Sequence, residues 1–343
     1  MNASNATENQ THVSTPFSCP LLDKYLEQSR GEMDTVYIVN CAINAVFSCL
    51  AFSANTLIMV TILRTPSLRS PTFYFVFGLA VTDFGVGLLA QPLYVLYKIA
   101  DLYRNTKLNC VAGISFALVS YQLAGASCLT MTLISVDRFM ALFLHLRYNE
   151  LMTLFRVKIA LVCAWILAAF SNIAWVLNLE VYFLLTASGF SLFLIITLFS
   201  YVMIFRTVRK HRHKIQQQSI AVSNLRATCS QDNSTQDNPI SSKTTNDRSN
   251  RKRLDSVAYK KSVKNMFLVY FAFLLCTLPL MCVLGLSSIL SRNTAVETAL
   301  NFTMALVFIE STVNPFLCCI LMKDLRKEVW KTLRRMSGHL SRA

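Results

Sequence analysis

The sequence is poor in charged residues and in histidine. Only 15% of its 343 residues are charged, against 54% that are hydrophobic, whereas about 25% of a water-soluble domain is charged. This scarcity excludes an ordinary soluble domain and favours a membrane protein. The five histidines lie outside the long apolar runs, and no metal-binding spacing of His or Cys appears within them. An intramembrane enzyme is therefore not expected.

Two further membrane classes are excluded by what is missing. A transporter is expected to show repeated halves with Gly- or Pro-broken helices at matching positions, and the chain shows neither. A light-driven pump would carry a retinal-binding lysine in its last span, but Val296–Met322 has no lysine.

Seven apolar runs are long enough for a helix that needs about 20 residues to cross a hydrocarbon core of about 30 Å. The stretch Ile159–Phe205 is nearly continuous, and as one helix it would be about 70 Å long. It must therefore fold back near Asn178-Leu179-Glu180, and we predict an all-α membrane protein, a seven-transmembrane helix bundle. The expected spans are Val36–Leu63, Thr72–Ala100, Val111–Phe143, Val157–Leu177, Val181–Phe205, Met266–Leu290 and Val296–Met322.

Glycosylation signals and basic residues both predict the orientation. Asn2, Asn5 and Asn9 are Asn-x-Ser/Thr acceptors at the start of the chain, with no apolar signal peptide ahead of them. All but six of the 33 Lys and Arg residues then fall in or beside segments on the cytoplasmic side, as the positive-inside rule requires. We expect a multi-pass plasma-membrane protein with its N-terminus extracellular and its C-terminus cytoplasmic. The net charge of +15 reflects this topology, so the lipid bilayer is an expected partner and nucleic acid is not.

Two cytoplasmic segments have distinct compositions. Residues from about 216 to 250 are rich in Ser, Thr, Asn and Gln, which predicts a disordered loop. Leu325, Val329 and Trp330 are expected on one face of a short amphipathic C-terminal helix that lies on the anionic inner leaflet. The expected parts are residues 1–35 (glycosylated extracellular N-terminus), 36–322 (seven-span domain) and 323–343 (cytoplasmic helix and tail).

A series of polar, aromatic and proline residues stands in the spans in a fixed order. In chain order they are Asn55, Leu79-Ala80-Val81-Thr82-Asp83, Asp137-Arg138-Phe139, Trp165, Tyr201, Phe273, Cys276-x-x-Pro279 and Asn314-Pro315. With these residues the chain resembles the rhodopsin-like (class A) G-protein-coupled receptors. Its short loop at Asn178–Glu180 is most similar to the melanocortin, adenosine, cannabinoid and lysophospholipid group. The resemblance implies a cell-surface receptor that transmits the binding of an extracellular small-molecule ligand to a heterotrimeric G protein.

The Asp137-Arg138 pair closes the third span. Charges at the membrane are costly enough to suggest a function, although a basic residue that merely marks the end of a spanning helix is equally consistent. The resemblance assigns G-protein coupling to Asp137, Arg138, Phe139, Leu146 and Tyr201.

Two prolines and two substituted positions bear on activation. Pro279 and Pro315 interrupt the hydrogen-bond ladders of the sixth and seventh helices, and so supply hinges about which the cytoplasmic ends can swing. Thr277 stands where the family usually has tryptophan, and Cys318 where it usually has tyrosine. The alternative is therefore a receptor-like scaffold or ligand trap without G-protein coupling.

A carboxylate in mid-membrane, Asp83, needs polar partners, a cation or a proton. The resemblance places Asn55, Asp83, Ser127 and Asn314 in a polar cluster that binds an allosteric sodium ion. The alternative is a protonated Asp83 without an ion. We expect no other metal and no other cofactor.

The ligand pocket implied by the resemblance has mostly aromatic or small residues. Ser120 stands where amine receptors carry an aspartate, so a charged amine would lack its counter-ion. A largely apolar lining favours a non-aminergic, lipophilic small molecule, but each aromatic residue could equally serve helix packing. The candidate residues are Tyr94, Tyr97, Phe116, Ser120, Tyr121, Ala124 and Leu284.

The family's usual disulfide cannot form, since Gly113 occupies its third-helix site and the loop at Asn178–Glu180 has no cysteine. Of the eleven cysteines, only Cys19 and Cys110 clearly lie on the oxidising side. We predict that these two pair and draw the N-terminal segment over the ligand entrance. Two free thiols, or a Cys110–Cys282 bond, are the alternatives.

Overall fold

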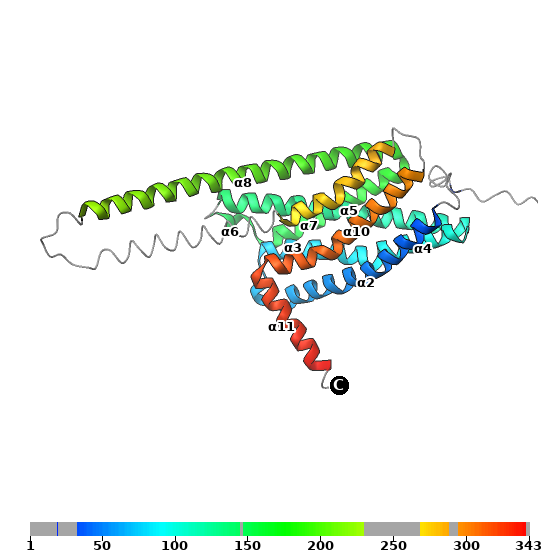
Figure 1. Ribbon diagram of the computed structural model, residues 1–343, viewed down its shortest axis with the longest axis horizontal. Helices are drawn as coiled ribbons and strands as arrows, with labels where there is room; N and C mark the ends of the chain where they lie inside the picture. The colour runs from blue at the N-terminus through cyan, green and yellow to red at the C-terminus, as the bar shows by residue number, and fades with distance from the viewer. Residues whose placement is uncertain (1–18, 20–32, 145–146, 230–267, 288–293, 341–343) are drawn as a thin grey trace, which may run out of the picture.

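The chain folds into a bundle of long helices that run side by side (Figure 1). The computed structural model describes residues 19, 33–144, 147–229, 268–287 and 294–340. Within these ranges seven helical segments are long and apolar enough to cross a membrane. The predicted all-α fold with seven spans is confirmed.

The second span, Pro71–Leu102, combines three elements, because a π-helical turn interrupts it. Such turns are rare and often stand at functional sites. The elements in chain order are α2 (Asp34–Arg64), η1 (Pro66–Leu68), α3 (Pro71–Gly85), η2 (Val86–Ala90, the π-helical turn), α4 (Gln91–Leu102), α5 (Thr106–Leu144), α6 (Tyr148–Leu151), α7 (Leu154–Leu177), α8 (Leu179–Cys229), the helix Leu268–Ser287, α10 (Thr294–Leu321) and α11 (Lys323–Leu340).

The chain reverses between α7 and α8 at a single residue, Asn178. Its backbone is extended, with φ −155° and ψ 112°, so it ends α7. Its side-chain oxygen then accepts a hydrogen bond of 3.1 Å from the backbone N–H of Val181 in the first turn of α8. An Asn side chain that satisfies a free N–H at a helix start is a standard cap. The fold-back predicted from length therefore has a local cause.

Helix α8 is longer than the composition predicted, because it continues to Cys229. Residues 216–229 were expected in a disordered loop, and this part of the expectation is wrong. No glycine or proline interrupts the sequence between Lys214 and Cys229, and its Gln, Ala, Leu and Arg residues favour helix. The remainder of the expected loop, residues 230–250, lies outside the described residues.

Helix α11 follows α10 after one residue and turns away from the bundle axis (Figure 1). Leu325 and Val329, four residues apart, are buried against the core. Trp330 was predicted to share their face, but it is 58% exposed, so this part of the prediction is wrong. It lies five positions after Leu325, which rotates it well away from the i, i+4 row.

The bundle contains two main apolar clusters. The larger one gathers near α11 and includes Phe75, Leu79, Met131 and Phe273. The second includes Ala90, Tyr94, Phe116, Leu123 and Phe308. Buried polar side chains, among them Asp83, Ser127 and Asn314, belong to neither cluster.

Candidate functional site

The Asp137-Arg138 pair is buried at the end of α5 nearest α6. The Nε atom of Arg138 donates to Oδ2 of Asp137 at 3.0 Å. Its Nη2 atom contacts the same oxygen and also the hydroxyl of Thr72 on α3. The hydroxyl of Tyr148 donates to the other carboxylate oxygen, Oδ1, at 2.6 Å. Both oxygens of Asp137 are thus satisfied, and Arg138 is held against its neighbour.

The sequence did not predict two of these partners, Thr72 and Tyr148, because no local pattern distinguishes them from other residues. Tyr148 lies in the short helix α6, between the third and fourth spans. Burial, together with the hydrogen bond to Asp137 and its charge, raises the pKa of the Tyr148 hydroxyl above its usual range. The hydroxyl therefore remains a donor at neutral pH.

The other residues assigned to coupling connect neighbouring helices through their rings. Phe139 lies 4.5 Å from Phe143 and 6.0 Å from Phe199 of α8, between ring centroids. Tyr201 of α8 stacks on Tyr270 of the helix Leu268–Ser287, with centroids 5.4 Å apart. Leu146 lies outside the described residues. The described coupling residues therefore join α5, α8 and the helix that carries Pro279.

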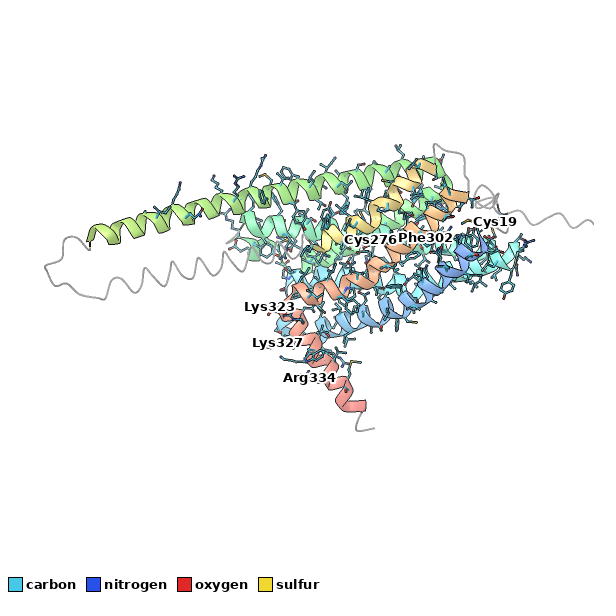
Figure 2. All side chains as sticks on the ribbon, in the orientation of Figure 1. Cys19, Cys276, Phe302, Lys323, Lys327 and Arg334 are labelled. Atoms are coloured by element: carbon cyan, nitrogen blue, oxygen red, sulfur yellow. A yellow bond between two sulfur atoms is a disulfide. The ribbon has the colours of Figure 1, made fainter. Side chains whose placement is uncertain are left out.

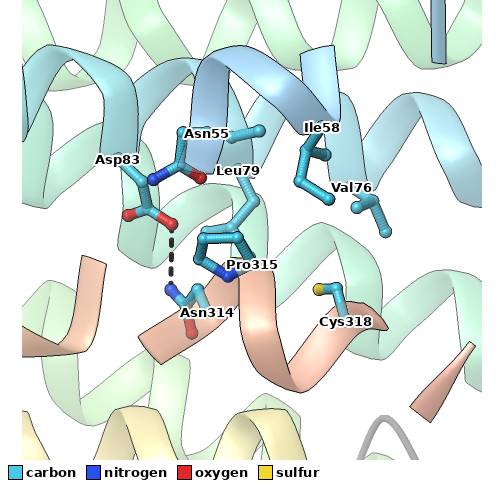
Figure 3. Close-up of a pocket in the computed structure, with 9 residues that line it drawn as sticks. Asn55, Ile58, Val76, Leu79, Asp83, Asn314, Pro315 and Cys318 are labelled. Atoms are coloured by element: carbon cyan, nitrogen blue, oxygen red, sulfur yellow. Dashed lines mark hydrogen bonds between the residues drawn. The ribbon is translucent and has the colours of Figure 1, made fainter. Parts of the chain in front are cut away.

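The mid-membrane polar cluster brings together Asn55, Asp83 and Asn314, all fully buried. The Nδ2 atom of Asn314 donates to Oδ2 of Asp83 at 3.0 Å (Figure 3). The Nδ2 atom of Asn55 donates to the carbonyl oxygen of Ser311 at 2.9 Å, which joins α2 to α10. The three residues line a small cavity with Ile58, Val76, Leu79, Ala80, Pro315 and Cys318 (Figure 3).

A second buried acid, Glu310, completes this cluster and was missed in the sequence. It is 4% exposed, and its Oε1 atom accepts from the same Nδ2 atom of Asn314 that donates to Asp83. Among the described residues neither acid forms an ion pair with Lys or Arg. The signal that could have found Glu310 is a carboxylate inside an apolar span, which is costly and therefore suggests a function.

Ser127, the fourth member predicted for the cluster, is buried on α5. Its hydroxyl oxygen and the Oδ1 atom of Asn314 have no hydrogen-bond partner among the described residues. Hydroxyl, amide and carboxylate oxygens are the donors that hard cations prefer. The oxygens of Asp83, Glu310 and Asn314 therefore form a donor set that fits a small cation, whereas the lining of the cavity at Asp83 does not include Ser127.

The predicted ligand-pocket residues fall into two aromatic clusters. In the first, Phe116 lies 5.3 Å from Tyr94 and is stacked on Tyr97 at 6.2 Å, between centroids. In the second, Tyr121 lies 5.8 Å from Trp175 and 4.9 Å from Tyr182. These are the contacts that the packing alternative predicts, so a role in ligand binding stays a prediction.

The remaining pocket candidates differ in exposure. Ser120 is buried, and its hydroxyl has no hydrogen-bond partner in the described part of the chain. Leu284 is half-buried and Ala124 is exposed. The hydroxyl of Tyr94 donates to Oδ1 of Asn301 on α10 at 2.7 Å. This polar contact was not anticipated.

A disulfide joins Cys19 to Cys110, as predicted, with their Cα atoms 5.9 Å apart. Both residues are buried, and Cys282 is a free thiol, so the alternatives are excluded. Cys19 lies at the opposite end of the bundle from Lys323 and Arg334 (Figure 2). The N-terminal segment predicted to cover the ligand entrance and the acceptors Asn2, Asn5 and Asn9 lie outside the described residues.

Known receptors resemble this chain over between two fifths and most of its length. Residues 54–180 and 170–317 match the family model of the 7 transmembrane receptor (rhodopsin family). The alpha-1A adrenergic receptor of Oryzias latipes is 24% identical over 320 residues, which are 86% of this chain and 67% of the relative. The adenosine receptor A2b of Gallus gallus is 30% identical over 136 residues, 40% of this chain and 38% of the relative. The histamine H2 receptor of Cavia porcellus is 33% identical over 135 residues, 39% of this chain and 37% of the relative.

The matching relatives include receptors from outside the melanocortin, adenosine, cannabinoid and lysophospholipid group, which we predicted to be nearest in form. Adenosine receptors belong to that group, whereas adrenergic and histamine receptors do not, so the nearest group stays a prediction. The match to the family model spans well over half of the chain and runs from within the first membrane-spanning helix to within the seventh. The chain therefore belongs to the rhodopsin family of seven-transmembrane receptors, which are signalling proteins and not enzymes.

Proposed function

We propose that the chain is a plasma-membrane receptor that converts the binding of an extracellular small-molecule ligand into activation of a heterotrimeric G protein. The observation that carries the proposal is the buried Asp137-Arg138 pair, held by Thr72 and Tyr148 at one end of the bundle. Such a restrained pair has a second state, in which Arg138 leaves Asp137 and meets a partner. A signalling switch requires two such states with different affinities for the partner.

The proposed switch includes a hinge. Pro315 lies inside α10 and Pro279 inside the helix Leu268–Ser287, where each removes a backbone hydrogen bond. An outward swing of the latter helix would separate the stacked rings of Tyr201 and Tyr270. We propose that Asp137, Arg138, Phe139, Leu146 and Tyr201 then form the surface that contacts the G protein.

The disulfide and the basic residues support the proposed orientation. Cys19 and Cys110 are bonded, and disulfides persist in oxidising compartments outside the cytosol. Lys323 and Arg334 gather at the other end of the bundle (Figure 2), as expected for a cytoplasmic end. The N-terminus would then be extracellular, where Asn2, Asn5 and Asn9 could be glycosylated, and the C-terminus cytoplasmic.

The proposed ligand is a non-aminergic, lipophilic small molecule. Its support is the aromatic character of the residues near the end where α2 begins, and Ser120 in place of an acid. The second candidate is an amine or a nucleoside, because relatives are named for adrenergic, histamine and adenosine ligands. The two candidates differ in charge and polarity, so a ligand screen separates them.

We also propose an allosteric sodium ion at the Asp83 cluster. Asp83 and Glu310 supply negative charge, and Ser127 and Asn314 supply oxygens that have no described hydrogen-bond partner. A bound sodium ion would partly neutralise the two carboxylates. It would stabilise whichever receptor conformation binds it more tightly.

The decisive experiment reconstitutes the full-length chain in vesicles with purified G proteins of several subtypes and measures nucleotide exchange. Lipids, amines and nucleosides are added in separate arms, and empty vesicles serve as the control. We expect ligand-dependent exchange on at least one subtype, with the lipid arm active and the amine arm silent. Ligand binding without exchange on any subtype would favour the scaffold or ligand-trap alternative. An active amine or nucleoside arm would overturn the lipophilic assignment but keep the receptor.

A further inference from the structure

Helix α11 has two halves with different surroundings. In the first half, Leu325 and Val329 are buried in the larger apolar cluster, which also contains Ile58 and Ile62 of α2. In the second half, residues 333–337 are all exposed, and the helix extends away from the bundle (Figure 1). This second half is therefore accessible to a membrane surface or to another protein.

The exposed half carries a serine that closely follows two arginines. Arg334-Arg335-Met336-Ser337 is the one place in the whole sequence where a Ser or Thr has a basic residue both two and three positions before it. Both arginines are exposed, and neither forms an ion pair with an acid among the described residues. Protein kinases select substrates partly by the pattern of charge near the acceptor, and arginine pairs strongly with carboxylates. The segment therefore fits a kinase with an acidic substrate cleft.

The hydroxyl of Ser337 is also accessible, unlike the other hydroxyl of α11. Ser337 is exposed in the last turn of the helix and is followed by Gly338. Glycine weakens a helix and helix ends fray, so this turn can open to enter an enzyme cleft. Thr332, in contrast, is half-buried, and its hydroxyl donates to the carbonyl oxygen of Glu328 at 2.9 Å. No basic residue stands two or three positions before Thr332.

A phosphate on Ser337 would meet a row of side chains on one face of α11. Trp330, Arg334 and Ser337 are spaced by four and three residues, which places them on the same face. The guanidinium carbon of Arg334 lies 5.7 Å from the centroid of the Trp330 ring, a cation–π contact. A phosphoserine offers three strong acceptor oxygens, to which a guanidinium binds in bidentate fashion. Phosphorylation would therefore move Arg334 from the ring to the phosphate.

The phosphate would also change the charge of the exposed half. Residues 331–340 include Lys331, Arg334 and Arg335 but no acid, and such a basic segment is attracted to an anionic membrane surface. A phosphoserine carries a charge of about −1.5 to −2 at neutral pH, which offsets most of this attraction. It would also lie at the C-terminal end of α11, where the helix dipole disfavours negative charge. Both effects weaken the contact of this half with an anionic surface.

We propose that Ser337 is a phosphorylation site for an arginine-selective kinase, and that its phosphate releases the end of α11 from an anionic membrane surface. In the reaction, the Oγ atom of Ser337 bonds to the γ-phosphorus of ATP and the bond from that phosphorus to the bridging oxygen breaks. ADP leaves, and the hydroxyl proton passes to the kinase. The proposal rests on the proposed function for the cytoplasmic position of α11, where ATP and kinases are present.

The first test measures the modification itself. The full-length receptor in nanodiscs, which leave both faces of the bilayer open, is incubated with Mg-ATP and the catalytic subunit of the cyclic-AMP-dependent protein kinase. Peptide mapping by mass spectrometry follows the phosphorylated fraction of Ser337. We expect Arg334→Gln and Arg335→Gln each to slow the reaction by at least about tenfold, because each removes a charge-assisted contact with the kinase. Thr332→Ala is the matched control and should leave the rate unchanged.

The second test measures the contact with the membrane. Brominated lipids quench the fluorescence of Trp330 when its ring lies at the bilayer, and a Trp330→Phe receptor provides the signal of Trp165 and Trp175 for subtraction. In nanodiscs that contain phosphatidylserine, phosphorylation should lower the quenching of Trp330 by at least about twofold, because the basic half loses its attraction to the anionic surface. Ser337→Ala, treated with the same kinase and ATP, should show unchanged quenching.

An unmodified Ser337, or a rate that neither arginine variant slows, would overturn the site. Complete phosphorylation without a change in Trp330 quenching would overturn the release from the membrane. The nanodisc measurements require no ligand, no G protein and no particular orientation of the chain. A receptor that is phosphorylated as expected but causes no nucleotide exchange would therefore refute the proposed function alone. A coupling receptor with an unmodified Ser337 would refute this site alone.

Discussion

In the described part of the chain, acids are buried at two places, and their charge is compensated in opposite ways. At the end of α5, Asp137 lies against Arg138 and accepts a hydrogen bond from Tyr148. In mid-membrane, Asp83 and Glu310 share one amide group of Asn314, with no described ion pair to a base. The first site is neutralised within the chain, whereas the second requires a proton or a cation from solution.

This difference assigns the two sites different roles. A buried ion pair keeps its state until another group competes for one partner, because separating the charges leaves one of them uncompensated. Two buried carboxylates without a base cannot both be charged at an acceptable free-energy cost. We therefore interpret the α5 pair as the switch that a partner operates, and the Asp83–Glu310 cluster as the site through which solution conditions bias that switch.

The largest effect should come from removing the positively charged side chain of the Asp137-Arg138 pair. Arg138→Ala should nearly abolish nucleotide exchange on the G protein, since truncating one member of a buried charge pair at an interface costs about 2–5 kcal/mol or more. Exchange is measured per receptor molecule at the surface. Arg156→Ala is the matched control, because Arg156 is exposed and its described side-chain bond is to the carbonyl oxygen of Leu151. Full coupling by Arg138→Ala would disprove the role of this site.

Neutralising one acid at each site should change stability in opposite directions. Asp137→Asn leaves Arg138 without its carboxylate and should lower the free energy of unfolding by about 3 kcal/mol, as for other broken buried pairs. Glu310→Gln removes one of two like charges and should leave stability unchanged or raise it. Thermal unfolding in detergent, with choline replacing sodium, measures both. If both variants are destabilised equally, the contrast between the sites is wrong.

Sodium should act at only one of the two sites. Raising sodium at constant ionic strength should lower agonist affinity by about tenfold, within the usual range of coupling between two sites. Asp83→Asn and Glu310→Gln should each remove this sensitivity, whereas Asp137→Asn should keep it. Radioligand competition at several sodium concentrations provides the measurement. Equal sodium effects in the wild type and in Asp83→Asn would favour a protonated cluster without an ion.

The smallest effect should come from the hydrogen bond that restrains the switch. Tyr148→Phe removes a donor to Asp137 and should raise agonist-independent exchange by about threefold, since one hydrogen bond contributes roughly 0.5–1.5 kcal/mol. Tyr103→Phe serves as the control, because Tyr103 is 81% exposed at the other end of the bundle. Unchanged basal exchange would mean that the contact does not restrain Arg138.

Most of the fold was predictable, because it depends on properties that are local in the sequence. Span length follows from apolar composition, and the reversal at Asn178 follows from the bilayer thickness. The Cys19–Cys110 bond followed from the small number of cysteines on the oxidising side. Composition was less reliable for 216–229, since Ser- and Gln-rich sequence without Gly or Pro can extend a helix that has already started.

Only some contacts of the candidate sites could be predicted from the sequence. Asp137 and Arg138 are neighbours in sequence, so their pairing could be inferred directly. Tyr148 and Thr72 carry no local mark, and their contacts depend on how the short helix α6 and the start of α3 dock against α5. The ligand-pocket residues could not be separated into their two aromatic clusters without the packing of α4, α7 and α8.

The sequence by itself determined that seven helices cross the membrane and which polar residues each of them carries. It did so because apolar length and helical period are properties of single segments. Only the tertiary structure decided which polar groups meet. Asp83 and the Asn314 amide are 231 residues apart in the chain, and the rotation of α3 and α10 about their own axes is set by packing against the other helices. That packing placed Glu310 and Asp83 on one amide group, and so made two separate acids into one site.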